Sequence, residues 1–112
     1  MSQITTHILD TSAGIPARGV AVQLFRQEGQ HWTAIAAGQT NQEGRITDLL
    51  PAHKLLTAGI YKLKFETQPY FDSRATVAFY PFVEVVFHIS SDAHYHVPLL
   101  LNPFGYSTYR GA

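Results

Sequence analysis

The sequence predicts an all-β sandwich. About seven or eight segments of alternating or β-branched residues follow one another, and turn-forming residues recur about every ten positions, which is typical of sandwich domains. Only residues 68–75 have a composition compatible with one or two helical turns. At 112 residues the chain is long enough to bury about two-thirds of its unfolded surface. We therefore expect a single domain covering residues 1–112.

The first half of the chain contains four expected strands. A β-branched segment is closed by a turn-forming run at residues 10–16, and the next segment alternates so that Val20, Val22 and Leu24 share one face. A tight connection at residues 28–30 predicts a hairpin. The expected strands are residues 4–10, 19–26, 31–39 and 45–48.

The second half begins with an irregular segment, because Pro51 disfavours a regular element through residues 49–56. The next strand alternates, and we expect Ile60, Leu63 and Phe65 on its apolar face. The expected strands are residues 59–66, residues 83–89 and the two arms of a hairpin within residues 94–112, which turns at residues 102–105.

Composition excludes several classes of partner. Eight basic and eight acidic residues give a formal net charge of zero, so neither a nucleic acid nor an anionic membrane surface is an expected partner. The absence of cysteine rules out disulfides and thiolate zinc sites. No signal-peptide pattern or long apolar span is visible, so the default expectation is a cytoplasmic protein.

The histidines offer the clearest chemistry. His94 and His96 alternate with Tyr95, so both imidazoles are expected on one face of a strand. His7 interrupts an apolar, threonine-rich strand, where it could be either a core residue or a functional one. Two imidazoles on a strand can bind zinc when a third ligand such as His7 joins them. We prefer no metal, because no nearby carboxylate is placed to orient the rings.

Other polar residues carry weaker signals. His31, His53 and His88 lie next to turns or on polar faces and are expected to be structural. Arg45 follows a Glu-Gly turn and would usually be a solvated turn residue. It becomes a candidate binding group for a planar oxyanion or a carbonyl-rich ring only if the fold brings it to the histidines. A Ser-His-Asp hydrolase is less well supported, because no Gly-x-Ser-x-Gly elbow occurs.

Four segments together resemble a known family. Residues 7–10, 59–62, 95–101 and 106–111 are similar to the transthyretin-related family, the 5-hydroxyisourate hydrolases, and keep the same order along the chain. The resemblance implies a transthyretin-like (immunoglobulin-like) sandwich of two four-stranded sheets with one short helix. It also implies a homotetramer whose sites lie in a channel where two dimers meet.

The resemblance also assigns residues. It implies that His7, Arg45 and His96 are catalytic, with the general base left open between the two histidines. The expected substrate-binding residues are Arg45 and the C-terminal residues Tyr109, Arg110, Gly111 and Ala112. Arg110 would bind substrate or anchor the chain end, and Tyr109 would pack and orient that end.

One position departs from the family pattern. The family's final tetrapeptide normally closes with Ser, and this chain has Ala112. The missing hydroxyl could cost about 1 kcal/mol as an ordinary hydrogen bond, or on the order of a hundredfold in rate if it acted in the transition state. We therefore expect activity to be impaired.

The implied reaction is hydrolysis of 5-hydroxyisourate to 2-oxo-4-hydroxy-4-carboxy-5-ureidoimidazoline in urate catabolism, with no cofactor. Water would attack a ring carbonyl with help from an imidazole. One alternative is a carrier of a small aromatic ligand of the thyroid-hormone type, which rests on the fold alone. Another is a structural sandwich module. Some relatives of the family are periplasmic or peroxisomal, which leaves the compartment open.

Overall fold

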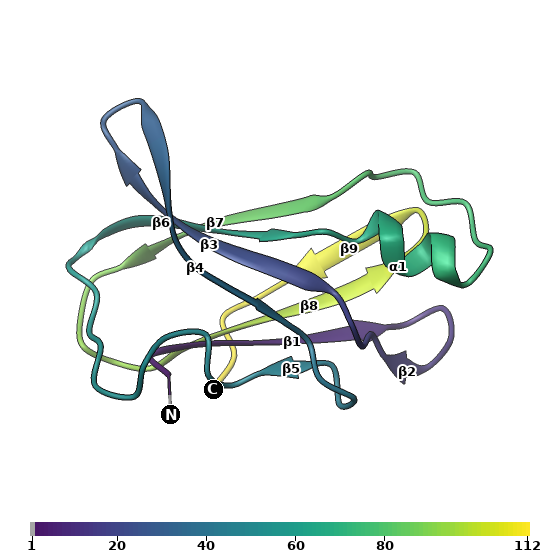
Figure 1. Ribbon diagram of the computed structural model, residues 1–112, viewed down its shortest axis with the longest axis horizontal. Coiled ribbons are helices and arrows are strands. Elements are labelled where there is room, and N and C mark those ends of the chain that lie inside the picture. Colours follow the sequence, from purple (N-terminus) through teal and green to yellow (C-terminus); the bar gives the residue numbers. More distant parts are fainter. Residues whose placement is uncertain (1) are drawn as a thin grey trace.

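The computed structural model describes residues 2–112 and consists of two packed β-sheets and one short helix (Figure 1). The first sheet has the order β2-β1-β8-β9, with β5 also paired to β1, and the second has the order β4-β3-β6-β7. The elements are β1 (Ile4–Asp10), β2 (Ile15–Pro16), β3 (Ala21–Glu28), β4 (His31–Gln39), β5 (Arg45–Ile46), β6 (Gly59–Phe65), α1 (Gln68–Ser73), β7 (Val83–Ile89), β8 (Tyr95–Asn102) and β9 (Gly105–Thr108). The predicted all-β sandwich is confirmed. The first sheet has a fifth strand because the two-residue strands β2 and β5 both pair with β1.

The core lies between the two sheets and is made by the inward faces of the long strands. Alternation places every second residue of β3, β6 and β8 against the other sheet. The side chains that are fully buried include Ile4, Ile8, Val20, Val22, Leu24, Tyr61, Leu63, Phe65, Val83, Ile89 and Leu99. Within residues 2–112, no helix has the length and apolar character needed to cross a membrane.

The structure corrects details of the predicted strands. In β6 the inward residue is Tyr61, which is fully buried, whereas Ile60 lies on the outer face with Lys62. Residues 60, 63 and 65 cannot share one face of a regular strand, because its period is two. The strand predicted at residues 45–48 is shorter, since β5 ends at Ile46.

The two strands that carry the histidines are neighbours in the first sheet. β1 pairs with β8 in parallel, with Ile4 opposite Tyr95 and Thr5 opposite His96 (Figure 1). β5 pairs antiparallel on the other side of β1, with His7 opposite Arg45. Segments from the beginning, middle and end of the chain therefore lie side by side.

A buried carboxylate fixes the end of β1 to the helix. Asp10 is almost fully buried, and its Oδ1 accepts hydrogen bonds from the backbone and hydroxyl of Ser12 and from the Ala13 backbone. Its Oδ2 accepts a 2.7 Å hydrogen bond from the Tyr70 hydroxyl and lies 3.9 Å from Nε of Arg74. Burial alone would raise the pKa of Asp10, but the hydrogen bonds outweigh it and lower the pKa below its usual value. Asp10 is therefore a charged anchor at neutral pH.

Replacing Tyr70 with phenylalanine should destabilise the fold by roughly 1.5–3 kcal/mol at pH 7, because it removes a hydrogen bond to a charged group. The stabilisation from Asp10 is present above the unfolded carboxyl pKa of about 3.9 and is lost as pH falls through the lowered folded pKa. The difference between Tyr70→Phe and the native protein should therefore be smaller in acid, below the folded pKa of Asp10, than at pH 7. Urea unfolding at equal protein concentration measures both values. Tyr80→Phe, at an exposed ring, is the control, and an equal effect of the two substitutions would contradict the assignment.

Candidate active site

The outward face of the first sheet brings together the polar residues singled out in the sequence. On β1 this face carries Thr5 and His7, and on β8 it carries His96, since Tyr95 and Val97 point into the core. The pairing of β1 with β5 adds Arg45 directly opposite His7. His7 thus lies on the outer face and is not one of the core residues.

A constrained turn places Arg45. The Asn41 side chain accepts hydrogen bonds from the backbone of Glu43 at 2.9 Å and of Arg45 at 3.0 Å. Gly44 adopts a φ of +74°, and a Cβ there would lie 2.5 Å from the backbone oxygen of Ile8. Only glycine satisfies both conditions, so this turn can pack directly against β1. The backbone N–H of Ile8 donates to the Gly44 carbonyl at 2.8 Å, which fixes Arg45 beside the sheet.

A single hydroxyl connects two of the histidines. Oγ1 of Thr5 lies 2.8 Å from Nε2 of His94 and 2.8 Å from Nδ1 of His96. The two imidazole rings are nearly parallel, with centroids 6.3 Å apart and an interplanar angle of 25°. The orientation of His96 is therefore fixed by Thr5, and its Nε2 is the ring nitrogen that Thr5 does not contact.

The end of the chain returns to the same place. Gly111 forms a β-bridge with His96, and its backbone N–H donates to the His96 carbonyl at 2.8 Å. Ala112 follows and lines a cavity of about 160 Å³ on the outer face. The complete lining is Thr5, Thr6, Arg45, Thr47, His94, His96 and Ala112.

The electrostatics of the site favour the neutral forms of His7 and His96. Partial burial and then the positive charge of Arg45 lower the pKa of His96 below its usual 6.5, and the charges of His94 and His7 act in the same direction. Partial burial and Arg45 also lower the pKa of His7, although Glu43 partly opposes them. At pH 7 both rings are therefore mainly unprotonated and can accept a proton.

Gly111 is the position where a small change should disturb His96 most directly. A Cβ at Gly111 would lie 2.5 Å from Cδ2 of His96, which is closer than real carbon contacts allow. We expect Gly111→Ala to displace the imidazole and lower kcat/KM by about a hundredfold, with little change in thermal stability. Gly105→Ala is the matched control, because its nearest neighbour would be 3.6 Å away on the Asn102 side chain. Equal kcat/KM values for the two variants would show that His96 does not need this space.

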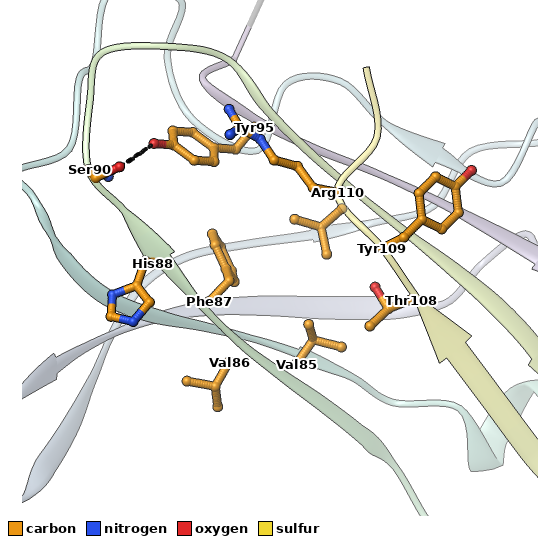
Figure 2. A pocket seen from close by; sticks show the side chains of 10 residues that line it. Val85, Val86, Phe87, His88, Ser90, Tyr95, Thr108, Tyr109 and Arg110 are labelled. Carbon is orange, nitrogen blue, oxygen red and sulfur yellow. Dashed lines mark hydrogen bonds between the residues drawn. The ribbon is translucent and has the colours of Figure 1, made fainter.

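Tyr109 and Arg110 lie at a second and larger cavity. This crevice of about 420 Å³ opens between β7 and the C-terminal segment, and Figure 2 shows its lining side chains. The guanidinium of Arg110 lies 4.3 Å from the ring centroid of Tyr95, whose hydroxyl accepts a hydrogen bond from the Ser90 backbone. The crevice walls combine valine and phenylalanine side chains with tyrosine, histidine, serine, threonine and arginine. The structure therefore brings His7, Arg45, His96, Gly111 and Ala112 together and places Tyr109 and Arg110 elsewhere.

Sequence reasoning missed the threonines of the site. Thr5 is the partner of both His94 and His96, and Thr47 lines the cavity. The alternation that puts Thr5 on the face of His7 was visible, but the pairing with β8 was not. Within residues 2–112, no group of three or more His, Cys, Asp or Glu side chains has a metal-binding arrangement.

Comparison with known proteins places the chain in a family. Residues 4–111 match the family model described as the HIUase/Transthyretin family. The chain belongs to the HIUase/Transthyretin family. A relative from Mus musculus, named 5-hydroxyisourate hydrolase, is 45% identical over 114 residues, which covers 99% of this chain and 96% of the relative.

Solved structures of the HIUase/Transthyretin family have the same fold. The 5-hydroxyisourate hydrolase of Klebsiella pneumoniae is 40% identical, covers 97% of this chain and 98% of its own, and has a TM-score of 0.85. Sea bream transthyretin in complex with thyroxine is 32% identical, covers 99% of this chain and 96% of its own, and has a TM-score of 0.91. Backbone similarity alone therefore does not separate the two kinds of family member, and only their site residues can distinguish them.

Proposed function

We propose that this protein hydrolyses 5-hydroxyisourate to 2-oxo-4-hydroxy-4-carboxy-5-ureidoimidazoline, a step of urate catabolism. The observation that carries the proposal is the convergence of His7, Arg45 and His96 on one outward face of the first sheet. The relatives named 5-hydroxyisourate hydrolase support it, because their sequences are 40–46% identical to this chain over nearly its whole length.

The geometry supports a water attack assisted by imidazole. His96 is held by Thr5 through Nδ1, so a neutral ring can receive a proton at Nε2. The water oxygen bonds to a ring carbonyl carbon, the water proton passes to the imidazole, and the adjacent carbon–nitrogen bond breaks as that nitrogen takes a proton. Proton transfer of this kind contributes typically 10²–10⁴-fold. His96 is the better placed base, because it lines the cavity, and His7 assists from beside Arg45.

Arg45 supplies the positive charge that the reaction needs. Its guanidinium can bind a carbonyl oxygen of the urate-like ring and stabilise the negative charge that develops when water adds. The same charge lowers the pKa of both imidazoles, so substrate binding and base activation depend on one residue. Arg110 anchors the chain end against Tyr95, Gly111 bridges to His96, and Ala112 lines the cavity.

A homotetramer would complete the site. A cavity that encloses a small ligand usually measures about 300–1,000 Å³, whereas the one beside His96 measures about 160 Å³. A second subunit packed against the outward face of the first sheet would supply the missing wall. The strands at the ends of the two sheets, β7 and β9, carry the exposed apolar side chains Val86 and Tyr106, which suits pairing between copies. The cytoplasmic location expected from the sequence stays a prediction.

A carrier of a small aromatic ligand is the second candidate, and the similarity to sea bream transthyretin favours it. The two candidates separate when the protein is mixed with freshly generated 5-hydroxyisourate and the ultraviolet absorbance is followed. The hydrolase should consume the compound at a rate proportional to protein concentration and above the spontaneous rate. Saturable binding without consumption would support the carrier and contradict the hydrolase.

Ala112 should limit the rate. Because residue 112 lines the cavity with Arg45 and His96, a hydroxyl there can reach a bound ligand or an imidazole. We expect Ala112→Ser to raise kcat/KM several-fold, the effect of a hydrogen bond worth about 1 kcal/mol. Ala112→Val adds bulk without a hydroxyl and should give no increase. Failure of the serine variant to exceed the native rate would show that the hydroxyl is not needed.

A further inference from the structure

Thr5 has a contact geometry that constrains protons as well as positions. Its Oγ1 is 2.8 Å from one nitrogen of His94 and 2.8 Å from one nitrogen of His96, yet a hydroxyl has only one hydrogen to donate. When both rings are neutral, Thr5 donates to one imidazole and the other imidazole donates to Thr5. When both rings are neutral, the tautomer of one ring therefore fixes the tautomer of the other.

Two neutral arrangements satisfy this rule. In the first, Nδ1–H of His96 donates to Thr5 and Thr5 donates to Nε2 of His94, which leaves Nε2 of His96 free to accept a proton. In the second, Nε2–H of His94 donates to Thr5 and Thr5 donates to Nδ1 of His96, so Nε2 of His96 carries the hydrogen. Only the first arrangement makes His96 a base toward the cavity.

We propose that Thr5 and His94 are positioning residues that form a proton path from His96 to the protein surface. This inference rests on the proposed hydrolysis. When His96 takes the water proton at Nε2, its Nδ1 proton moves to Oγ1 of Thr5, and the hydroxyl proton moves to Nε2 of His94. His96 is then neutral with a hydrogen on Nε2, and His94 carries the positive charge.

The surroundings of the three groups suit transfer outward. Thr5 is buried and His96 is half-buried, whereas His94 is exposed. Arg45 and His7 face His96 and disfavour positive charge there, which favours moving the proton away. Lys54 and Asp92 line another hollow with His94, next to the residues that precede β1 and β8. The proton thus moves from the half-buried His96 to the exposed His94, which lines the same cavity but is open to solvent.

The hydrogen-bonded path is tested without substrate by nitrogen NMR of the imidazoles in the intact protein at alkaline pH. In the native protein His96 should be protonated at Nδ1 and unprotonated at Nε2. Thr5→Val keeps the shape of the side chain but removes the hydroxyl, so His96 should become a mixture of tautomers. Thr5→Ser should restore the native signals. Identical His96 nitrogen shifts in the native protein and in Thr5→Val would overturn the proposal.

Kinetics test the role of the path in turnover. Thr5→Val should lower kcat on the order of tenfold with KM little changed, and Thr5→Ser should recover most of the rate. His94→Asn should also be slower, and added imidazole should restore part of its rate by accepting the proton. Native turnover in Thr5→Val or His94→Asn would refute the path while leaving the hydrolase intact. Absence of turnover in the native protein would refute the hydrolase, and the NMR result would still decide the path.

Discussion

Replacing His96 with alanine is expected to lower kcat/KM for 5-hydroxyisourate by about 10²–10⁴-fold, the contribution typical of general acid–base catalysis. The His96 imidazole lines the cavity with Arg45, is oriented by Thr5 through Nδ1 and is half-buried. Its pKa is lowered below 6.5, first by burial and then by Arg45, so the native protein should stay active at pH 7 and lose activity as pH falls through that lowered pKa. Steady-state rates between pH 5 and pH 8 measure both effects.

A matched histidine on another surface controls for nonspecific damage. His31 is exposed at the start of β4 in the second sheet, so His31→Ala should keep near-native kinetics. Thermal unfolding of both variants separates loss of chemistry from loss of fold. Near-native turnover in His96→Ala would remove the assigned base from the account.

Arg45→Glu is expected to abolish measurable turnover, because it replaces a cation that binds the developing oxyanion with an anion that repels it. Loss of one transition-state donor alone costs about 10²–10³-fold. The charge change also acts on the histidines: Arg45 lowers the pKa of His7 and His96, so its reversal must raise both. The acidic limb of the pH–rate profile should therefore move to higher pH in any variant with residual activity.

Arg45→Gln is the variant in which that shift can be measured, since it removes the charge without reversing it. Its acidic limb should lie above that of the native protein. Arg26→Glu, in β3 of the other sheet, is the charge-reversal control and should leave the profile unchanged. A profile for Arg45→Gln that coincides with the native one would show that the guanidinium does not act on the imidazoles.

Local pattern and turn-forming residues predicted the extents of several strands well. β4 and β7 have the predicted bounds, and the turn at residues 102–105 joins β8 to β9 as expected. Prediction failed where local apolar content was ambiguous, as with Ile60 and Tyr61, because either residue could face the core and only packing against the second sheet decides.

The site was only partly predictable for a different reason. His7, Arg45 and His96 were implied by the family resemblance, but their convergence depends on the parallel pairing of β1 with β8 and the antiparallel pairing of β1 with β5. Such long-range pairing has no signature in local periodicity. Thr5 was missed because a threonine in a strand is ordinary until His96 is known to lie opposite it. Asp10 was interpreted as a turn residue because its buried partner, Tyr70, is far away in sequence.

The most direct test of the central claim is a crystal structure of the protein with a hydrolysis-resistant analogue of the urate-like ring. The two cavities make different predictions about where that ring lies. A ring oxygen is expected to contact the Arg45 guanidinium. Nε2 of His96 is expected to lie within hydrogen-bonding distance of a water placed to attack the ring carbonyl carbon. An analogue bound instead in the crevice between β7 and Arg110, with Arg45 and His96 free of it, would contradict the account.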